Sequence, residues 1–452
     1  MKEIVNQLYE TKVKVHDLTP QALHYARSRA NPYELVGRSI FVNRSAVKMA
    51  NLDALCQFLD RARERCANGE FRFVDLCSGP GGFTEYILWR TKQMGLQAKG
   101  WGMTLKGEQD FALEKMDPAI DVPNRFQPFY GADQTGDVYR TANIKAFVDL
   151  VEAGSQTEGV DLVTCDGGFN VTGDEWNQED HSRQILLCQV LIGLSVLREH
   201  GDFLFKVFDL YTPFMVELVY ILYRMFEKIA IVKPFTSRPA NSERYIVCRS
   251  LRAKPNAQVL QHLFGVNDKF NELKGDDAAK PIISSHATQQ PGFLPREEKI
   301  KNGLTEVVHI VDPEIVMKEK GLIGPIKSQN MRLTMWQKEA LEELYKYAND
   351  KARPEYDQEG IRRRCLQEWK LPIPQASRRP PPDTPYGRDR NNDGRYQSSA
   401  HNNRFSPYSR NGGNDRGRNG DGDRNRDRDR RQDDPYRHGH RDHGQAQAHR
   451  RY

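Results

Sequence analysis

The 452-residue chain has no run of 18 consecutive apolar residues, and its N-terminus, MKEIVNQLYE, has no apolar core of the kind found in signal peptides. Neither a membrane-spanning segment nor a secretory signal is therefore expected. The seven cysteines include no C-x-x-C pair, and several lie within apolar, strand-like runs. This pattern favours reduced, buried thiols in an intracellular protein over disulfides or a zinc site.

The last part of the chain, residues 376–452, lacks Leu, Ile, Val, Met, Trp and Cys altogether. Such a segment cannot bury a core, so we expect it to be disordered. It holds 18 Arg and 11 Asp without Lys or Glu, a net charge of +7 in a chain of net charge +6, which leaves −1 for residues 1–375. Tyr and Phe are spaced among the arginines, which suits loose contact with single-stranded nucleic acid; a merely solubilising or disordered tail explains the composition equally well.

Seven short apolar segments predict strands, and segments with helical periodicity separate most of them. The expected strands are 71–77, 98–105, 126–132, 160–166, 202–208, 228–235 and 244–251. The expected helices are 1–30, 44–66, 82–94, 139–153, 182–199 and 212–226. Strands that alternate with helices indicate a mostly parallel α/β sheet, and the short gap between the last two strands predicts an antiparallel pair. This plan resembles the Rossmann-like, seven-stranded sheet of class I S-adenosylmethionine-dependent methyltransferases.

Four polar residues far apart in the sequence can be interpreted as one active site: Lys48, Asp166, Lys206 and Glu243. Lys206 lies inside the apolar strand FLFKVF, where a lysine is uncommon unless it is paired or functional. A sugar hydroxyl is a poor nucleophile at neutral pH and needs a base, which a lysine can provide when its pKa is lowered and a carboxylate orients it. Taken singly, Lys48 and Glu243 could be a helix surface lysine and a strand-edge acid, and a snorkelling or salt-bridged lysine is the less favoured alternative for Lys206.

A glycine-rich turn, Ser78-Gly-Pro-Gly-Gly82, joins the first strand to a helix. Ligands in α/β sheets bind beyond the carboxyl ends of strands, where glycines permit close approach and a helix N-terminus favours a carboxylate such as that of S-adenosylmethionine. Pro80 and the absence of G-x-G-x-x-G argue against a dinucleotide; a purely structural turn is the alternative. Asp133 and Asp137 follow the third strand, and Asp137 is the better candidate for the adenine or ribose.

Asp166 is followed by Gly167-Gly168-Phe169 at the end of its strand. Methyltransferases that act on exocyclic amines usually have Asn-Pro-Pro-Tyr or a close variant there. The sequence therefore favours an oxygen target over a base nitrogen.

Longer motifs make the resemblance specific. ARSRANPYELV, FVNRSAVKMANLD, DLCSGPGGFTEYILWR, FKVFDLYTPF and KPFTSRPANSERYIVC resemble the eukaryotic cap-specific mRNA 2′-O-methyltransferases that act on the first transcribed nucleotide, within the FtsJ-type RNA methyltransferases. The close match covers residues 26–251, and a looser one reaches about residue 374.

The resemblance implies a set of site residues, with S-adenosylmethionine as the cofactor and no metal. The implied catalytic tetrad is Lys48, Asp166, Lys206 as proton acceptor, and Glu243. The implied cofactor contacts are Asn43, Cys77, Ser78, Gly79, Pro80, Gly81, Gly82, Phe83, Asp137 and Val138. The implied contacts with capped RNA are Arg27, Asn177 and Asn241. Arg29 and the basic face of helix 44–66 are further candidates for phosphate contacts, although a solvated helix face is the commoner explanation.

Four parts of the chain follow from these observations. We expect a helical cap- and RNA-binding segment at 1–43, the methyltransferase domain at 44–255, a small α/β C-terminal extension at 256–375 and the disordered tail at 376–452. Within the extension, 256–300 looks loop-rich, 304–311 predicts a strand, and 331–350 and 355–374 predict helices. Animal members of the family are longer at both ends, so their protein partners are not carried over to this chain.

The function implied is methylation of the ribose 2′-oxygen of the first nucleotide after the 5′ cap of mRNA. The second cap nucleotide, ribosomal RNA and transfer RNA remain alternative targets, and a catalytically idle RNA-binding protein is an alternative of another class. Capped mRNA is the expected partner, with the transcription or capping machinery as a further possibility. Nuclear localisation is expected from the substrate class alone, since the sequence has no clear Lys-rich import signal.

Overall fold

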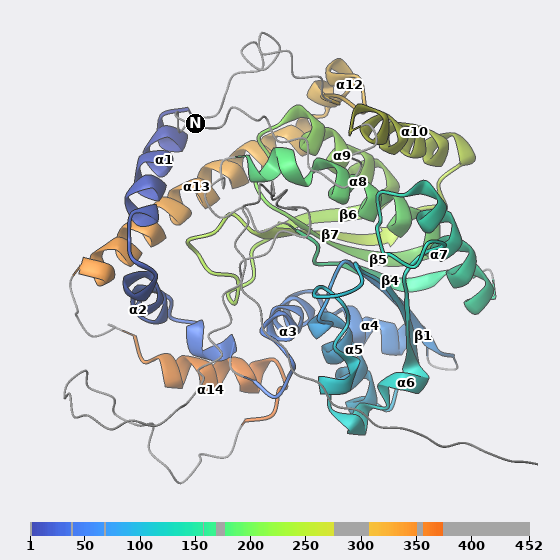
Figure 1. Ribbon diagram of the computed structural model, residues 1–452, viewed down its shortest axis with the longest axis horizontal. Coiled ribbons are helices and arrows are strands. Elements are labelled where there is room, and N and C mark those ends of the chain that lie inside the picture. Colours follow the sequence, from blue (N-terminus) through green and yellow to red (C-terminus); the bar gives the residue numbers. More distant parts are fainter. Residues whose placement is uncertain are drawn as a thin grey trace, which may run out of the picture. The chain divides into compact units, whose positions relative to one another are not determined.

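A seven-stranded sheet in the order β3-β2-β1-β4-β5-β7-β6 forms the centre of the computed structural model (Figure 1). The structure describes residues 2–37, 39–66, 69–156, 158–168, 177–274, 307–349 and 356–373. The strands are β1 Phe71–Leu76, β2 Ala98–Met103, β3 Phe126–Phe129, β4 Val160–Cys165, β5 Leu197–Val207, β6 Phe226–Val232 and β7 Arg244–Leu251. Only β7 runs antiparallel to its neighbours, so the predicted strands and the antiparallel last pair are confirmed.

Helices cover both faces of this sheet, as the alternating pattern predicted (Figure 1). On one side lie α3 Ser45–Cys56, α4 Phe58–Arg65 and α5 Gly82–Gln93, with the short elements η2 Leu113–Lys115, η3 Pro118–Ile120 and α6 Val122–Arg125. On the other lie α7 Thr141–Gly154, α8 Gln178–Val196, α9 Pro213–Met225 and α10 Ala257–Lys274. Because side chains alternate along a strand, Phe203 and Phe205 of β5 join the core under α8 and α9, whereas Leu204 joins the core under α3.

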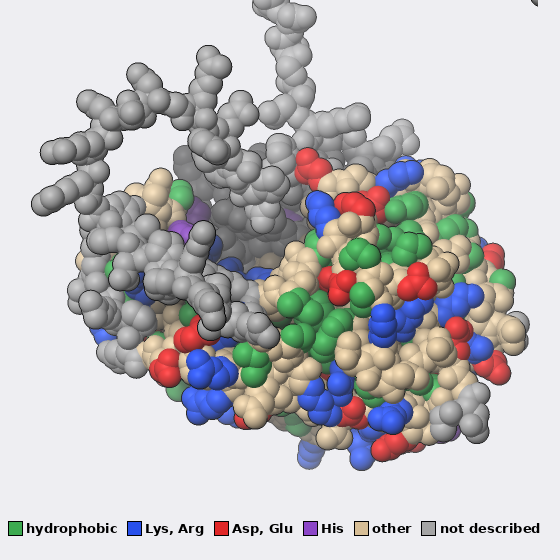
Figure 2. All heavy atoms as spheres, turned by 90° about the horizontal axis from the view of Figure 1, so that it is seen from below, with side chains coloured by type: hydrophobic (Ala, Val, Ile, Leu, Met, Phe, Trp, Pro, Cys, Tyr) green, Lys and Arg blue, Asp and Glu red, His purple; other side chains and the backbone are tan. Residues whose placement is uncertain are grey.

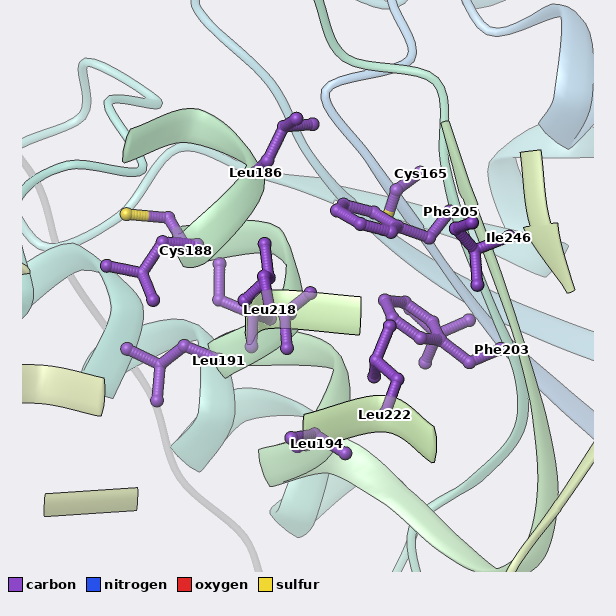
Figure 3. Packing of buried hydrophobic residues seen from close by; sticks show 14 of the residues in the cluster. Cys165, Leu186, Cys188, Leu191, Leu194, Phe203, Phe205, Leu218, Leu222 and Ile246 are labelled. Carbon is purple, nitrogen blue, oxygen red and sulfur yellow. The ribbon is translucent and has the colours of Figure 1, made fainter. Parts of the chain in front are cut away.

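The core under α8 and α9 is made of aromatic strand residues packed against aliphatic helix residues (Figure 3). The rings of Phe203 and Phe205 stack with their centroids 5.7 Å apart. Leu191 and Leu218, from α8 and α9, are fully buried in the same cluster. This packing fixes β5 firmly and thereby the position of Lys206 on its opposite face.

The N-terminal region consists of two helices, α1 Lys2–His16 and α2 Pro20–Ala30, rather than the single helix expected over 1–30. The two helices are separated before Pro20, which occupies the first turn of α2. The Thr19 hydroxyl caps this turn by accepting a hydrogen bond from the Ala22 N–H. The expected helix 44–66 is likewise divided, because Gln57 has a left-handed backbone with φ 56°. Both α1 and α2 pack on α13 Lys320–Asn349 (Figure 1).

The C-terminal extension differs from the prediction in two places. Its described elements are all helical: α10, α12 Pro313–Lys318, α13 and α14 Gln358–Glu368. The loop expected from residue 256 is wrong for 257–274, because α10 buries Leu263 and Phe270 despite its polar composition. The strand expected at 304–311 is not formed in its described part, 307–311, where the N–H groups of Ile310 and Val311 donate to the Glu217 carboxylate.

The described residues all belong to one compact unit. The predicted disorder of 376–452, the remainder of the expected strand and Phe169 lie outside the described residues. All seven cysteines are free thiols, four of them buried. No described helix combines the length and the apolar character that a membrane crossing requires. On the face seen in Figure 2, acidic and basic side chains are intermixed, as the small net charge of residues 1–375 predicts.

Candidate active site

Four elements deliver one polar residue each to the carboxyl end of the sheet. Lys206 lies near the end of β5 and, by strand alternation, on the α3 face together with Leu204. Lys48 lies on α3, Asp166 directly follows β4, and Glu243 directly precedes β7. Parallel strands β4 and β5 bring their carboxyl ends together, while antiparallel β7 begins at the same edge. The topology thus explains why residues up to 195 positions apart meet.

The four side chains form a continuous chain of ion pairs. The Lys206 Nζ lies 3.2 Å from the Asp166 Oδ1 and donates a 2.6 Å hydrogen bond to the Asp166 backbone oxygen. The Lys48 Nζ lies 3.9 Å from the Asp166 Oδ2 and 2.9 Å from the Glu243 Oε2. Each of these side chains is only 10–13% exposed. Two cations and two carboxylates therefore share one largely desolvated site.

Electrostatics fix the charge of two members of this group. Burial raises the pKa of the Glu243 carboxyl, but Lys48, Lys206 and Lys233 outweigh burial and hold that pKa well below its usual range. Burial lowers the pKa of Lys48, but Asp166 and Glu243 outweigh it and raise the pKa above its ordinary value. Lys48 is therefore a permanent cation and Glu243 a permanent anion near neutral pH.

The two carboxylates of the tetrad differ in how fully they are hydrogen-bonded. The Tyr245 hydroxyl donates a 2.7 Å hydrogen bond to the Asp166 Oδ1, which fixes this carboxylate from a third side. The Glu243 Oε1 is buried and accepts no hydrogen bond from the described residues. A buried carboxylate oxygen without a donor is costly, so its presence favours a ligand that supplies one.

Lys233 is a site residue that the sequence analysis missed. Its Nζ donates to the backbone oxygens of Asn241 and Glu243, both at 2.8 Å, and to the Asn241 Oδ1 at 3.0 Å. Burial lowers its pKa to about 7, against the opposing charge of Glu243. Lys233 thereby braces the loop that carries two predicted site residues. Little in the sequence indicates this role, because Lys233 lies near the end of the expected strand 228–235, where a lysine usually reaches solvent.

The glycine turn at the end of β1 is held by Asp75, a second residue without a predicted role. The Asp75 carboxylate accepts from Ser78 and Thr164 hydroxyls at 2.5 and 2.7 Å, and from the Thr84 N–H and hydroxyl. Burial raises its pKa to about 6. Because these donors come from the turn, β4 and α5, one carboxylate fixes the turn against both neighbours.

The turn itself requires glycine. A Cβ at Gly79 would lie 1.9 Å from the Gln109 backbone oxygen, and one at Gly82 would lie 2.1 Å from the Asn43 Oδ1. Predicted cofactor residues that are distant in sequence, Asn43 and the turn, are therefore in direct contact. The turn places Phe83 and the amino end of α5 at the end of β1.

The predicted cofactor residues after β3 approach the same turn. Asp137 lies close enough to Cys77 for its charge to add to burial in raising the pKa of that thiol to about 12. Val138, next to it, is buried. Asp133 instead accepts from Thr135 and the Asn143 amide and pairs with Arg140, so it stabilises the loop.

This set of groups fits S-adenosylmethionine. The amino end of α5, at the glycine turn, suits the methionine carboxylate. The Asp137 carboxylate, on the neighbouring strand end, suits the hydroxyl or amine donors of the adenosine. Residues 77–83 would hold the methionine part and Asp137-Val138 the nucleoside.

Next to the tetrad, a cavity of about 650 Å³ lies between α1, α2, α13 and the loop before β7. Of the predicted RNA contacts, Arg27 and Asn241 line it. Asn177 caps α8 beside Gln178, which lines it. The polar lining also includes Lys12, His16, Gln178 and Gln337, which sequence reasoning missed because they resemble solvated helix positions. Apolar walls with a few polar groups, at this volume, suit a heterocyclic ligand.

The further phosphate candidates are less suitable. The Arg29 guanidinium stacks on the Tyr25 ring and donates to the Tyr25 backbone oxygen. Arg65 on α4 pairs with Asp202, which lies four residues before Lys206 on β5. At about 3.3 Å per residue this places Arg65 roughly 13 Å from the tetrad.

Comparison with known proteins agrees with this geometry. Residues 41–251 match the family model of FtsJ-like methyltransferases. The chain is 37% identical over 82% of its length to "Cap-specific mRNA (nucleoside-2'-O-)-methyltransferase 1" of Xenopus laevis, and equally to that of Homo sapiens. It covers 41% and 42% of those relatives, so it spans about two fifths of their length.

A third relative carries a different name. "Inactive cap-specific mRNA (nucleoside-2'-O-)-methyltransferase 1B" of Caenorhabditis briggsae is 33% identical over 83% of this chain, which covers 43% of it. Overall sequence similarity therefore does not show whether a chain is active. Activity has to be judged from the chemical groups at the site. The family match spans α3, the glycine turn and all four tetrad residues. Residues 41–251 of this chain, which hold the whole tetrad and the glycine turn, are therefore similar to FtsJ-like methyltransferases.

Proposed function

We propose that the chain transfers a methyl group from S-adenosylmethionine to the ribose 2′-oxygen of the first nucleotide after the 5′ cap of mRNA. The observation that carries this proposal is the buried chain Lys206–Asp166–Lys48–Glu243 beside the glycine turn. The names of the similar proteins support the cap as the substrate feature.

The residues suggest the following division of work. When bound, S-adenosylmethionine supplies an electrophilic methyl group on a sulfonium centre. Lys206 accepts the proton of the 2′-hydroxyl, and the Asp166 carboxylate and backbone oxygen hold its Nζ in place. Lys48 and Glu243, whose charges are fixed, orient Asp166 and the ribose. Positioning of the hydroxyl is expected to supply much of the rate acceleration.

The cavity supports a cap-binding role for the N-terminal region. We assign the cap to the space lined by Arg27 and Asn241, with Asn177 at its edge, and the ribose to the adjoining tetrad. In this proposal residues 1–43 bind RNA and residues 44–255 carry out catalysis. Residues 256–375 support the RNA-binding and catalytic parts, and residues 376–452 make looser contact with RNA. A nuclear location and contact with the transcription or capping machinery are part of this proposal, because the substrate is made there.

Two alternatives stay distinct. Methylation of the second cap nucleotide, ribosomal RNA or transfer RNA would use the same tetrad, but the cavity would bind a different part of the RNA. A catalytically idle RNA-binding protein is the other alternative, and the inactive-named relative makes it concrete. The complete tetrad and the clamped glycine turn favour activity.

The decisive experiment is methyl transfer from labelled S-adenosylmethionine to capped RNA and to the same RNA with a 5′-triphosphate, followed by nuclease mapping of the labelled nucleotide. We expect label on the first nucleotide of capped RNA only. Arg27→Ala should weaken RNA binding more than cofactor binding, whereas Lys318→Ala, at an exposed lysine on α12, should change neither. Equal rates on both RNAs would favour another RNA target, and no transfer at all would favour the idle protein.

A further inference from the structure

Two aromatic rings stack on each other beside the tetrad without belonging to the cavity. Tyr33, between α2 and η1 Glu34–Gly37, and Phe235, after β6, have ring centroids 5.2 Å apart and an interplanar angle of 17°. Phe235 is 44% exposed, although it is a large apolar residue. Tyr33 stacks on the Phe235 ring, and the exposed part of Phe235 can contact a further planar ligand.

The position of Phe235 is tied to the catalytic helix. Its backbone N–H donates a 2.7 Å hydrogen bond to the Asn51 Oδ1 on α3. Asn51 follows Lys48 by three residues, a rise of about 4.5 Å along one face of the helix. Phe235 also belongs to the loop that Lys233 braces and that ends at Glu243. The backbone of Phe235 is therefore held against the helix that carries Lys48, one helical turn from that residue.

Positive charge flanks this ring pair on the side of α14. The Gln358 amide donates to the backbone oxygens of Ser28 and Asn31, which fixes α14 next to η1. Arg364 lies close enough to Tyr33 to oppose the larger, pKa-raising effect of burial on its hydroxyl. Arg363 and Arg364 are exposed and form no ion pair among the described residues. By contrast, Arg44 and Arg238 are paired with Glu34.

We propose that the base of the nucleotide after the methylated one stacks on Phe235, and that the next phosphates run across Arg363 and Arg364 of α14. The inference rests on the proposed function and extends it to the downstream RNA. Aromatic faces bind bases of any sequence, and neighbouring arginines bind the backbone, which is the combination used for single strands. A protein partner would not need an exposed ring that is tied to the helix carrying Lys48.

The test compares capped RNAs with one, two and six nucleotides after the cap. For the wild-type protein we expect KM to fall when the second nucleotide is added. Phe235→Leu keeps an apolar side chain but removes the stack, so KM for the longer RNAs should rise about 5- to 100-fold, with KM for the one-nucleotide substrate and kcat unchanged. Phe235→Trp should restore the wild-type values. Tyr345→Leu, at an aromatic residue on α13 that is 39% exposed, is the matched control and should have no effect.

A second, surface variant tests the path independently. Arg363→Gln/Arg364→Gln should raise KM only for the six-nucleotide RNA and reduce the slope of log KM against log salt by about 1 to 1.5. Equal effects of Phe235→Leu on all three lengths, or none on any, would overturn the stacking proposal. An unchanged salt slope in the arginine variant would overturn the path across α14. Absence of transfer by the wild-type protein to every capped RNA would instead refute the proposed function.

Discussion

Lys206 illustrates how a charged residue is accommodated in a buried strand. Its neighbours Phe203 and Phe205 face the opposite core, so strand alternation directs the lysine toward α3 and the carboxyl end of the sheet. There the Asp166 carboxylate and backbone oxygen receive its Nζ. A burial of this kind is tolerated because the charge is paired, and it places an amine where a ribose hydroxyl would meet it.

Lys206→Ala should abolish most methyl transfer, because it removes the amine assigned as the base, and Lys48, the other amine of the tetrad, is held as a cation by Asp166 and Glu243. We expect kcat to fall about 10²- to 10⁴-fold, while S-adenosylmethionine binding stays near normal because the glycine turn is untouched. Single-turnover rates with saturating capped RNA, and cofactor binding by calorimetry, measure the two quantities. Lys228→Ala, an exposed lysine on β6, is the control. Near-normal turnover by Lys206→Ala would remove it from the role of base.

At this scale the sequence predicted the tetrad but not its supports. Lys48, Asp166, Lys206 and Glu243 each stand in a recognisable motif, and the structure brings them together. Lys233 was missed because its three acceptors, at 2.8 to 3.0 Å, are backbone and amide oxygens of a loop whose path no local pattern reveals. The catalytic roles themselves stay predictions until the variants are measured.

Among the elements, the loop between β6 and β7 has the most connections. It is joined to the N-terminal region through Glu34, whose carboxylate receives Arg238 at 2.8 Å and Arg44 at 3.0 Å. Arg44 also donates to the Thr236 backbone oxygen. Three segments that carry predicted cofactor, RNA and tetrad residues are thus linked by one carboxylate that is 17% exposed.

Glu34→Gln should destabilise the protein at neutral pH. Burial alone would raise the pKa of the Glu34 carboxyl, but Arg238 and Arg44 outweigh it and lower the pKa from 4.5 to about 2. Because the folded-state pKa is the lower one, the stabilisation is present above pH 4.5 and is lost as the pH falls toward 2. We expect a loss of about 1–3 kcal/mol in the free energy of unfolding at pH 7, which shrinks at pH 3.

Denaturant unfolding of wild type and variant at the two pH values measures this difference. Glu342→Gln, which breaks an exposed Lys338–Glu342 pair on α13, should cost far less at either pH. A loss from Glu34→Gln that is equal at pH 7 and pH 3 would mean that the carboxylate charge is not the cause.

The elements also show where sequence patterns fail. The seven strands were predicted because each is a short apolar run bounded by turns. The central strand β4 is buried at every position, whereas the edge strands β3 and β6 are only partly buried. The segment that forms α10 was predicted as loop because its composition is polar. In the structure its Asn267 is buried, because it hydrogen-bonds to Gln184 of α8 and to the Tyr139 backbone oxygen. Such polar burial depends on partners more than 80 residues away, which local periodicity cannot detect.

At the scale of the whole molecule, charge and hydrophobicity are distributed very unevenly along the chain. Residues 1–375 carry a net charge of −1 and all of the Leu, Ile, Val, Met, Trp and Cys, whereas 376–452 carry +7. The described part of the chain contains the tetrad, the glycine turn and the cavity within one compact unit. Binding of a long RNA can therefore involve two physically different contributions, one from shape and stacking and one from charge.

Deletion of residues 376–452 should leave the melting temperature and the S-adenosylmethionine affinity unchanged, because the segment has no Leu, Ile, Val or Met with which to join a core. Its positive charge should add salt-sensitive, sequence-independent affinity for RNA, since each neutralised phosphate releases counterions. The 11 Asp among the 18 Arg keep that contribution well below what the arginines alone would give. We expect a modest rise in KM for long capped RNA, a shallower salt dependence, and no change for a capped oligonucleotide too short to reach the tail.

A tail with every Arg replaced by Lys separates charge from stacking, because Lys keeps the charge but lacks the planar guanidinium that stacks on bases. If charge dominates, this variant should keep the wild-type salt slope, and the deletion alone should lose it. Activity of the deleted protein on RNAs of different length, at two salt concentrations, completes the measurement. A truncated protein that unfolds, or that loses activity equally on short and long RNA, would show that residues 376–452 are part of the catalytic body.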